Sequence, residues 1–133
     1  MKMEYAWRGA FDNGELNALH AEGFDHEVDA YDWWGQVSLH SLGWVCARRG
    51  GWLVGFVNVA WDGGGHAFVL DTLVTAAVRR LGVGTALVLT AAEHARVAGC
   101  EWLHVDFEDH LRGFYFESCG FVGTNAGLIR LDG

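Results

Sequence analysis

Two arginines followed by two closely spaced glycines form the stretch of this chain with the clearest chemistry. The order is Arg79-Arg80-Leu81-Gly82-Val83-Gly84-Thr85, between an apolar run at 68–74 and a helix-like run at 85–97. The first N–H groups of a helix have no partner within it and carry the positive end of its dipole. Glycines let a ligand approach such a backbone closely. The stretch therefore predicts a seat for an anion, most naturally a phosphate or pyrophosphate.

The glycine order distinguishes among the known phosphate-binding motifs. The Gly-x-Gly-x-x-Gly fingerprint of dinucleotide-binding folds is incomplete here. The Gly-Lys-Ser/Thr tripeptide in the phosphate loop of nucleotide triphosphatases does not occur. The pattern Arg-x-x-Gly-x-Gly at 79–84 resembles the acyl-CoA pyrophosphate loop of the GCN5-related N-acetyltransferase (GNAT) family. A second stretch, Leu111-Arg112-Gly113-Phe114-Tyr115-Phe116-Glu117-Ser118-Cys119-Gly120-Phe121, resembles the late helix of that family, with Gly-Phe opening a strand. The chain is identified as a member on both motifs, a resemblance that covers 54–131 well and 1–51 only in pattern.

This resemblance implies a single α/β domain over residues 1–133 with the acyl-CoA N-acyltransferase fold. The expected sheet is mixed and mostly antiparallel, with a central parallel strand pair and helices on both faces. The implied activity is transfer of an acetyl group from acetyl-CoA to the amine of a small molecule or peptide, by direct attack in a ternary complex. The alternatives are a non-catalytic acyl-CoA-binding module of the same fold and, more weakly, a protein–protein module on the Trp-rich N-terminal half.

The cofactor residues follow from the same resemblance. The backbone near Leu73 and Val74 is expected to pair with the pantetheine arm like an added strand. The loop is expected to hold the pyrophosphate, with Arg79 at the motif position. The full set of expected cofactor-binding residues is Leu73, Val74, Arg79, Arg80, Leu81, Gly82, Val83, Gly84 and Thr85. Acetyl transfer needs no metal, and no His-x-x-x-His pair or other metal-ligand spacing is present.

Two catalytic roles are expected, a general acid for the departing thiolate and a general base for the amine. The family usually keeps four residues from its helix Tyr to the Gly of Gly-Phe, a step that lands here on Phe116. Either the helix contains an extra residue, such as a bulge, with Tyr115 as the acid, or the acid is absent. For the base we select Asp71, on the strand that should flank the thioester. The alternatives are Asp106 and the histidines at 66, 104 and 110.

An acidic run at 25–32 suggests the chemistry of the acceptor. By resemblance this region forms part of the acceptor pocket, and Glu22, Asp25 and Trp33 are the expected substrate-binding residues. The net charge of −8 argues against nucleic acid and is compatible with a cationic amine. The alternative interpretation is a solvated acidic loop.

The apolar patterning places these residues on eleven elements. Strands are expected at 3–8, 44–47, 52–61, 66–74, 101–107, 121–122 and 127–131, and helices at 15–22, 33–42, 85–96 and 111–119. No apolar run approaches the ~20 residues of a membrane span, and the start does not resemble a signal peptide. The three cysteines are an odd number without Cys-x-x-Cys spacing and are expected to be reduced. We therefore expect a cytoplasmic protein without a membrane partner. Seven Trp leave a homodimer open.

Overall fold

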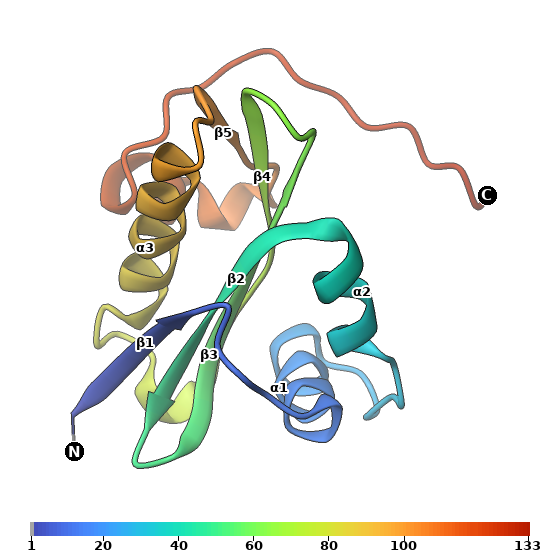
Figure 1. The fold of residues 1–133 in the computed structure, drawn as a ribbon, viewed down its shortest axis with the longest axis vertical. Coiled ribbons are helices and arrows are strands. Elements are labelled where there is room, and N and C mark those ends of the chain that lie inside the picture. Colours follow the sequence, from blue (N-terminus) through green and yellow to red (C-terminus); the bar gives the residue numbers. More distant parts are fainter. Residues whose placement is uncertain (1) are drawn as a thin grey trace.

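A computed structural model, which describes residues 2–133, places a five-stranded sheet at the centre of the protein (Figure 1). The strands follow one another in space in chain order: β1 (Met3–Trp7), β2 (Ser41–Arg49), β3 (Trp52–Trp61), β4 (His66–Val74) and β5 (Trp102–His104). The first four are antiparallel, and β5 runs parallel to β4. The mixed, mostly antiparallel sheet is therefore confirmed. The parallel pair lies at the sheet edge rather than at its centre, because no strand is added beyond β5 in the described chain.

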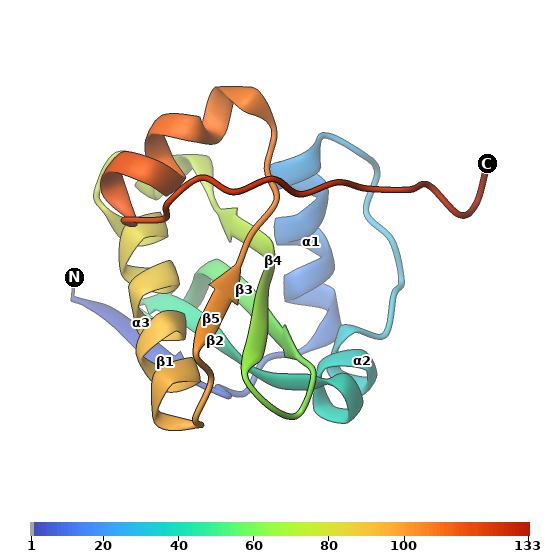
Figure 2. The same cartoon turned by 90° about the horizontal axis from the view of Figure 1, so that it is seen from above.

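Helices cover both faces of this sheet (Figure 2). α1 (Asn13–Phe24) packs on β3 and β4 and α2 (Trp33–His40) on β2 and β3, while α3 (Val83–Val97) contacts β1 to β4. Apolar side chains point both ways from the middle of the sheet: the α3 side holds Val57, Val69 and Leu87, and the α1–α2 side holds Phe56 and Leu73. β3 is accordingly buried along most of its length, as its nearly continuous apolar sequence indicates.

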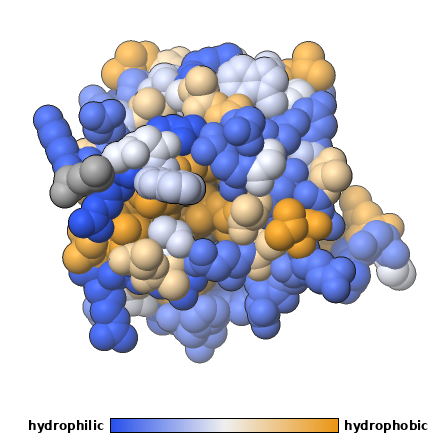
Figure 3. All heavy atoms as spheres, turned by 90° about the horizontal axis from the view of Figure 1, so that it is seen from below, coloured by the Kyte–Doolittle hydropathy of each residue, from blue (hydrophilic) through white to orange (hydrophobic). Residues whose placement is uncertain are grey.

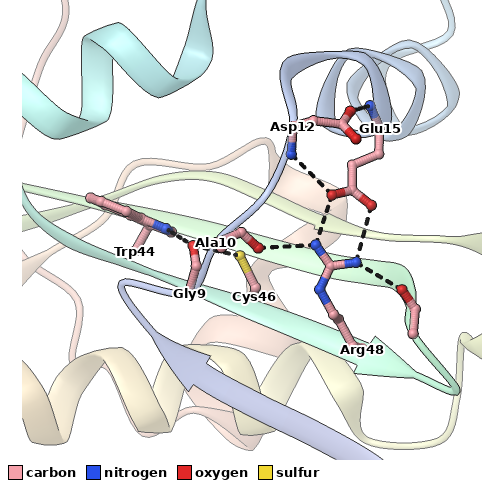
Figure 4. A network of polar contacts seen from close by, with 8 residues as sticks. Gly9, Ala10, Asp12, Glu15, Trp44, Cys46 and Arg48 are labelled. Carbon is pink, nitrogen blue, oxygen red and sulfur yellow. Dashed lines mark hydrogen bonds and ion pairs between the residues drawn. The ribbon is translucent and has the colours of Figure 1, made fainter.

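A polar network fixes the start of α1 against the sheet (Figure 4). Arg48 on β2 donates to both carboxylate oxygens of Glu15, at 3.0 and 2.7 Å, and to the carbonyl of Ala10 at 3.0 Å. Glu15 and the N-cap Asp12 also form a reciprocal capping box. Hydrogen bonding from Arg48 lowers the pKa of Glu15. The network orients α1, whose opposite end reaches the site described below.

Two sequence-based boundaries near α2 are wrong. The helix expected to run to residue 42 ends at His40, and the strand expected at 44–47 spans Ser41–Arg49. Ser41 is already extended and pairs with Ala60 of β3, whereas at the other end Arg49 pairs with Trp52. Pairing on both sides of β2 thus extends the strand beyond its apolar core.

The C-terminal third departs further from the expected pattern. The strand expected at 101–107 is shorter in the structure: β5 spans only Trp102–His104, because the chain no longer pairs with β4 after His104. The expected strands at 121–122 and 127–131 are absent from the described chain, since a strand needs a paired neighbouring strand and none pairs with this segment. Instead 120–133 runs as an extended tail across the view from above (Figure 2). The face of the molecule opposite this tail carries mostly hydrophilic side chains with an apolar area near its centre (Figure 3).

Three short helical turns flank α3 and β5 in the described chain. η1 (Ala76–Val78) follows β4, and η2 (Asp109–Leu111) leads into η3 (Gly113–Ser118), a π-helical turn. In residues 2–133 no helix is long and apolar enough to cross a lipid bilayer.

Candidate active site

A cleft of about 1210 Å³ opens where β4 and the chain after β5 separate. The two strands pair only from His66 to Phe68 on β4, so the second half of β4, 69–74, faces the cleft opposite 105–108. In the described chain this stretch of β4 has no strand partner on its β5 side. An unpaired strand edge presents N–H and C=O groups to which an extended ligand can add.

The glycine-bearing loop forms one end of the cleft. α3 begins at Val83, and its N-cap Gly82 has φ 78°, a left-handed conformation that favours glycine. No side chain caps this helix, so its first N–H groups are available to an anion. Of the nine expected cofactor residues, all except Leu81 line the cleft; Leu81 is 63% exposed outside it.

Two residues of this loop have roles that the motif did not indicate. The Arg79 guanidinium folds back: Nε donates to the Val74 carbonyl at 3.3 Å, and Nη2 lies 3.9 Å from a carboxylate oxygen of Glu22. A Cβ on Gly84 would lie 3.1 Å from the ring of Phe114. A side chain at position 84 would therefore crowd the Phe114 ring, so the packing of α3 against η3 favours glycine there as well.

A bulge in β4 determines where Asp71 points. Asn58 of β3 pairs with Leu70 and Phe56 pairs with Leu73, so two steps on β3 match three on β4. Asp71 lies in this extra stretch with φ 53° and lines the cleft. Burial raises the pKa of its carboxyl above the ordinary 3.8, opposed by His20 and by a hydrogen bond from Asn58. A carboxylate with a raised pKa beside an open cleft is suited to accept a proton.

The π-helical turn resolves the spacing of the late helix. In η3 the backbone hydrogen bonds span five residues instead of the four of an α-helix, as from the Cys119 N–H to the Phe114 carbonyl at 3.0 Å, so this helix contains the bulge that was one of the two expected alternatives. Tyr115 is 5% exposed and lines the cleft, where its hydroxyl donates to Oγ1 of Thr72 at 3.2 Å. Its ring stacks on Phe107. Burial raises the pKa of the phenol above 10.0, so the hydroxyl keeps its proton and can donate it.

The three expected acceptor residues are not all brought together. Asp25 lines the cleft as the left-handed C-cap of α1. Glu22 does not: its carboxylate accepts from Oγ1 of Thr75 at 2.8 Å and from the backbone N–H of Ala76 at 2.7 Å, which ties α1 to the turn after β4. Trp33 is buried beneath α1, and its indole N–H donates to Asn17 at 3.0 Å.

Sequence reasoning missed two polar residues beside Asp71 and Tyr115. Oγ1 of Thr72 accepts the hydrogen bond from the Tyr115 hydroxyl. Nε2 of His20 on α1 lies 4.0 Å from a carboxylate oxygen of Asp71. No local pattern marks either of them. Of the alternative bases, Asp106 and His110 line the cleft, whereas His66 and His104 contact each other outside it.

The comparisons with known proteins agree with this architecture. A sequence model described as the acetyltransferase (GNAT) family matches residues 7–121, and the chain belongs to this family of acetyltransferases, whose members use acetyl-CoA. Over 64 residues it is 43% identical to glucosamine 6-phosphate N-acetyltransferase 1 of Oryza sativa subsp. japonica. That match covers 48% of this chain and 37% of the rice protein, so the chain matches well under half of this relative's length.

Solved structures with low sequence identity share the fold over nearly the whole chain. A Trypanosoma brucei acetyltransferase superposes with a TM-score of 0.82 at 19% identity, covering 98% of this chain and 99% of its own. An aminoglycoside N-acetyltransferase in complex with CoA gives a TM-score of 0.77 at 17% identity, covering 98% and 95%. The α/β GNAT fold expected from the two motifs is therefore confirmed.

Proposed function

We propose that this protein is an acetyl-CoA-dependent N-acetyltransferase that acts on a cationic amine by direct attack in a ternary complex. One observation carries the proposal: the β4 bulge brings a carboxylate and a phenol hydroxyl to one cleft, beside an unpaired strand edge. Asp71 supplies the proton acceptor and Tyr115 the donor, the two groups that aminolysis of a thioester needs.

The cleft also suits the cofactor. The uncapped N-terminus of α3 and the loop arginines provide positive potential for a pyrophosphate, and the β4 edge provides hydrogen-bonding groups for an amide-containing arm. Acetyl-CoA, when bound, supplies the acetyl group as an activated thioester. Asp71 then removes a proton from the acceptor amine, and Tyr115 stabilises the departing sulfur by donating a hydrogen bond.

The charges of the cleft favour a cationic acceptor without a phosphate group. Away from the loop, the lining contains Asp25, Asp71, Asp106 and Glu108 and, among the described residues, no Lys or Arg. Carboxylates attract an ammonium group and repel a phosphate monoester. The acceptor of the rice relative, a phosphorylated amino sugar by its name, is for this reason not the one we propose.

The test is thiol release from acetyl-CoA with a panel of a diamine, a lysine peptide, glucosamine and glucosamine 6-phosphate. We expect turnover with an unphosphorylated amine, and loss of that turnover in Asp71→Asn, which keeps a residue type tolerant of positive φ at the bulge. Binding of CoA with no thiol release and no acetylated product from any amine would favour the binding-module alternative.

A further inference from the structure

We propose that His20 and His26 form a proton relay that carries the proton taken up by Asp71 out of the cleft to solvent. This inference rests on the proposed function. Asp71 is the group that meets the amine, and the two histidines are positioning residues that act through it. Neither histidine lines the cleft, so their role is distinct from substrate binding.

The three side chains and Asp29 lie in a continuous row. Nε2 of His20 is 4.0 Å from Oδ1 of Asp71, and Nδ1 of His20 is 2.7 Å from Nε2 of His26. On its outer side, Nδ1 of His26 contacts the carbonyl oxygen of Glu27 and lies 3.9 Å from Oδ2 of Asp29. The Asp71 and His20 side chains are 25% and 21% exposed, His26 is 32% and Asp29 is 69% exposed. The row therefore leads from the cleft to the surface.

The outermost contact determines the tautomer of both rings. The carbonyl of Glu27 can only accept, so Nδ1 of His26 must bear the hydrogen. In the neutral ring Nε2 of His26 is then bare and accepts from Nδ1 of His20. Neutral His20 consequently presents a bare Nε2 to the carboxylate of Asp71.

This tautomer leaves a place for one proton between Asp71 and His20. A carboxylate and a bare imidazole nitrogen are both acceptors, and 4.0 Å is too long for a hydrogen bond between them. A proton from the amine can occupy either group, and a hydrogen bond then forms between Nε2 of His20 and Oδ1 of Asp71. If His20 takes it at Nε2, the ring becomes an imidazolium whose Nδ1 proton can pass to His26.

The surroundings of His20 support a shared proton. The charged or titratable groups that face it are Asp71 from β4 and His26 and Asp29 from the loop after α1; its remaining ring neighbours are Phe24 and Trp33. Burial lowers the pKa of His20, opposed by Asp71 and Asp29, whereas burial raises the pKa of Asp71. Their proton affinities thus approach each other.

The relay conserves protons and charge. One proton enters from the acceptor amine at Asp71 and passes to Nε2 of His20, while the Nδ1 proton of His20 passes to Nε2 of His26. His26 in turn releases its Nδ1 proton to Asp29 or to water. Both rings then hold the opposite tautomer and recover the first one by exchange with solvent between turnovers.

The tautomers can be measured without any substrate, by nitrogen-15 NMR of the wild-type protein at alkaline pH, where imidazole rings are neutral. We expect Nδ1–H in His20 and in His26, whereas free imidazoles favour Nε2–H. His26→Phe should switch His20 to Nε2–H, facing Asp71, because Nδ1 loses its acceptor. His26→Gln retains an acceptor and should keep Nδ1–H. A wild-type His20 with Nε2–H would overturn the relay.

Kinetics test whether the proton takes this route. In His20→Gln the acid limb of the kcat/KM profile should move to lower pH, because the carboxylate alone then holds the proton. His26→Gln should lower kcat with CoA affinity unchanged, and added imidazole buffer should restore part of it. The matched control is His104→Gln, which breaks the other His–His contact of 2.7 Å, outside the cleft, and should leave the profile unchanged.

The outcomes separate this inference from the proposed function. An inactive wild-type protein that gives no product with any amine would refute the proposed function itself. An active wild-type protein whose pH profile is the same in His20→Gln as in His104→Gln would refute only the relay.

Discussion

Replacing Tyr115 by Phe removes one hydroxyl from the cleft and leaves the aromatic packing in place. In the free protein that hydroxyl donates to Thr72 at 3.2 Å, and the ring stacks on Phe107. Loss of one neutral hydrogen bond costs about 0.5–1.5 kcal/mol of folding free energy. The variant should therefore fold, with its ring still buried against Phe107, and any change in activity can be assigned to the missing donor.

The expected kinetic effect follows from the strength of a charged hydrogen bond. A donor to an anionic partner contributes about 1.5–3 kcal/mol, which converts to a loss of roughly 10- to 150-fold in kcat. The contact strengthens as charge develops on sulfur, so it stabilises the transition state and not the bound cofactor. CoA affinity should consequently stay near its wild-type value. Because burial raises the pKa of Tyr115 above 10.0, we expect no alkaline loss of turnover from this residue near neutral pH.

Thiol release under saturating acetyl-CoA and amine measures kcat, and calorimetry with CoA measures affinity. Tyr31→Phe is the matched control, because it removes the same hydroxyl from a tyrosine that contacts Gln36 outside the cleft. Wild-type turnover in Tyr115→Phe would refute the acid role and leave the thiolate to be protonated by water. An equal loss in the control would assign the effect to folding instead.

Three further variants test the glycine-bearing loop, the Glu15–Arg48 contact at the start of α1, and the acceptor side of the cleft. Gly82→Glu should abolish CoA binding in calorimetry, whereas Gly63→Glu, at a turn glycine with nearly the same φ of 81° and equally open space, should bind normally. Glu15→Gln should lower the unfolding free energy at pH 7 by about 1.5–3 kcal/mol, since it breaks a charge-assisted pair with Arg48. Because folding lowers the pKa of Glu15 from 4.5, this difference is complete above 4.5 and disappears as the pH falls through the lowered value, which chemical denaturation at several pH values measures. Asp25→Lys should raise KM for cationic amines more than for neutral ones at unchanged CoA affinity; equal effects would mean that Asp25 is merely solvated.

Local signals in the sequence were sufficient for most of the frame. The helices expected at 15–22 and 85–96 and the strand expected at 52–61 each depend on neighbours within a few residues, and all three appear as elements close to their expected places. The glycine-bearing loop at 79–85 is contiguous in the chain, so its motif is visible in the sequence alone. Only Leu81 of the nine expected residues lies outside the cleft lining.

What depends on partners far apart in the chain required the tertiary structure. The segments expected to be strands at 121–122 and 127–131 are rich in apolar residues, but no strand pairs with them in the described chain, and pairing rather than pattern makes a strand. Glu22 has the charge expected of an acceptor residue, yet its partners are the hydroxyl and N–H groups of Thr75 and Ala76.

The sequence by itself determined the family, the position of the glycine-bearing loop at 79–85 and the one-residue shift of Tyr115. The tertiary structure decided where the Tyr115 ring lies: η3 is π-helical, and the ring packs against Phe107, Phe114 and Phe121 at the edge of the cleft. It also decided the surroundings of Asp71. A bulge in β4 and the packing of α1 bring this carboxylate to His20, fifty-one residues earlier in the chain, and no local pattern records such a contact.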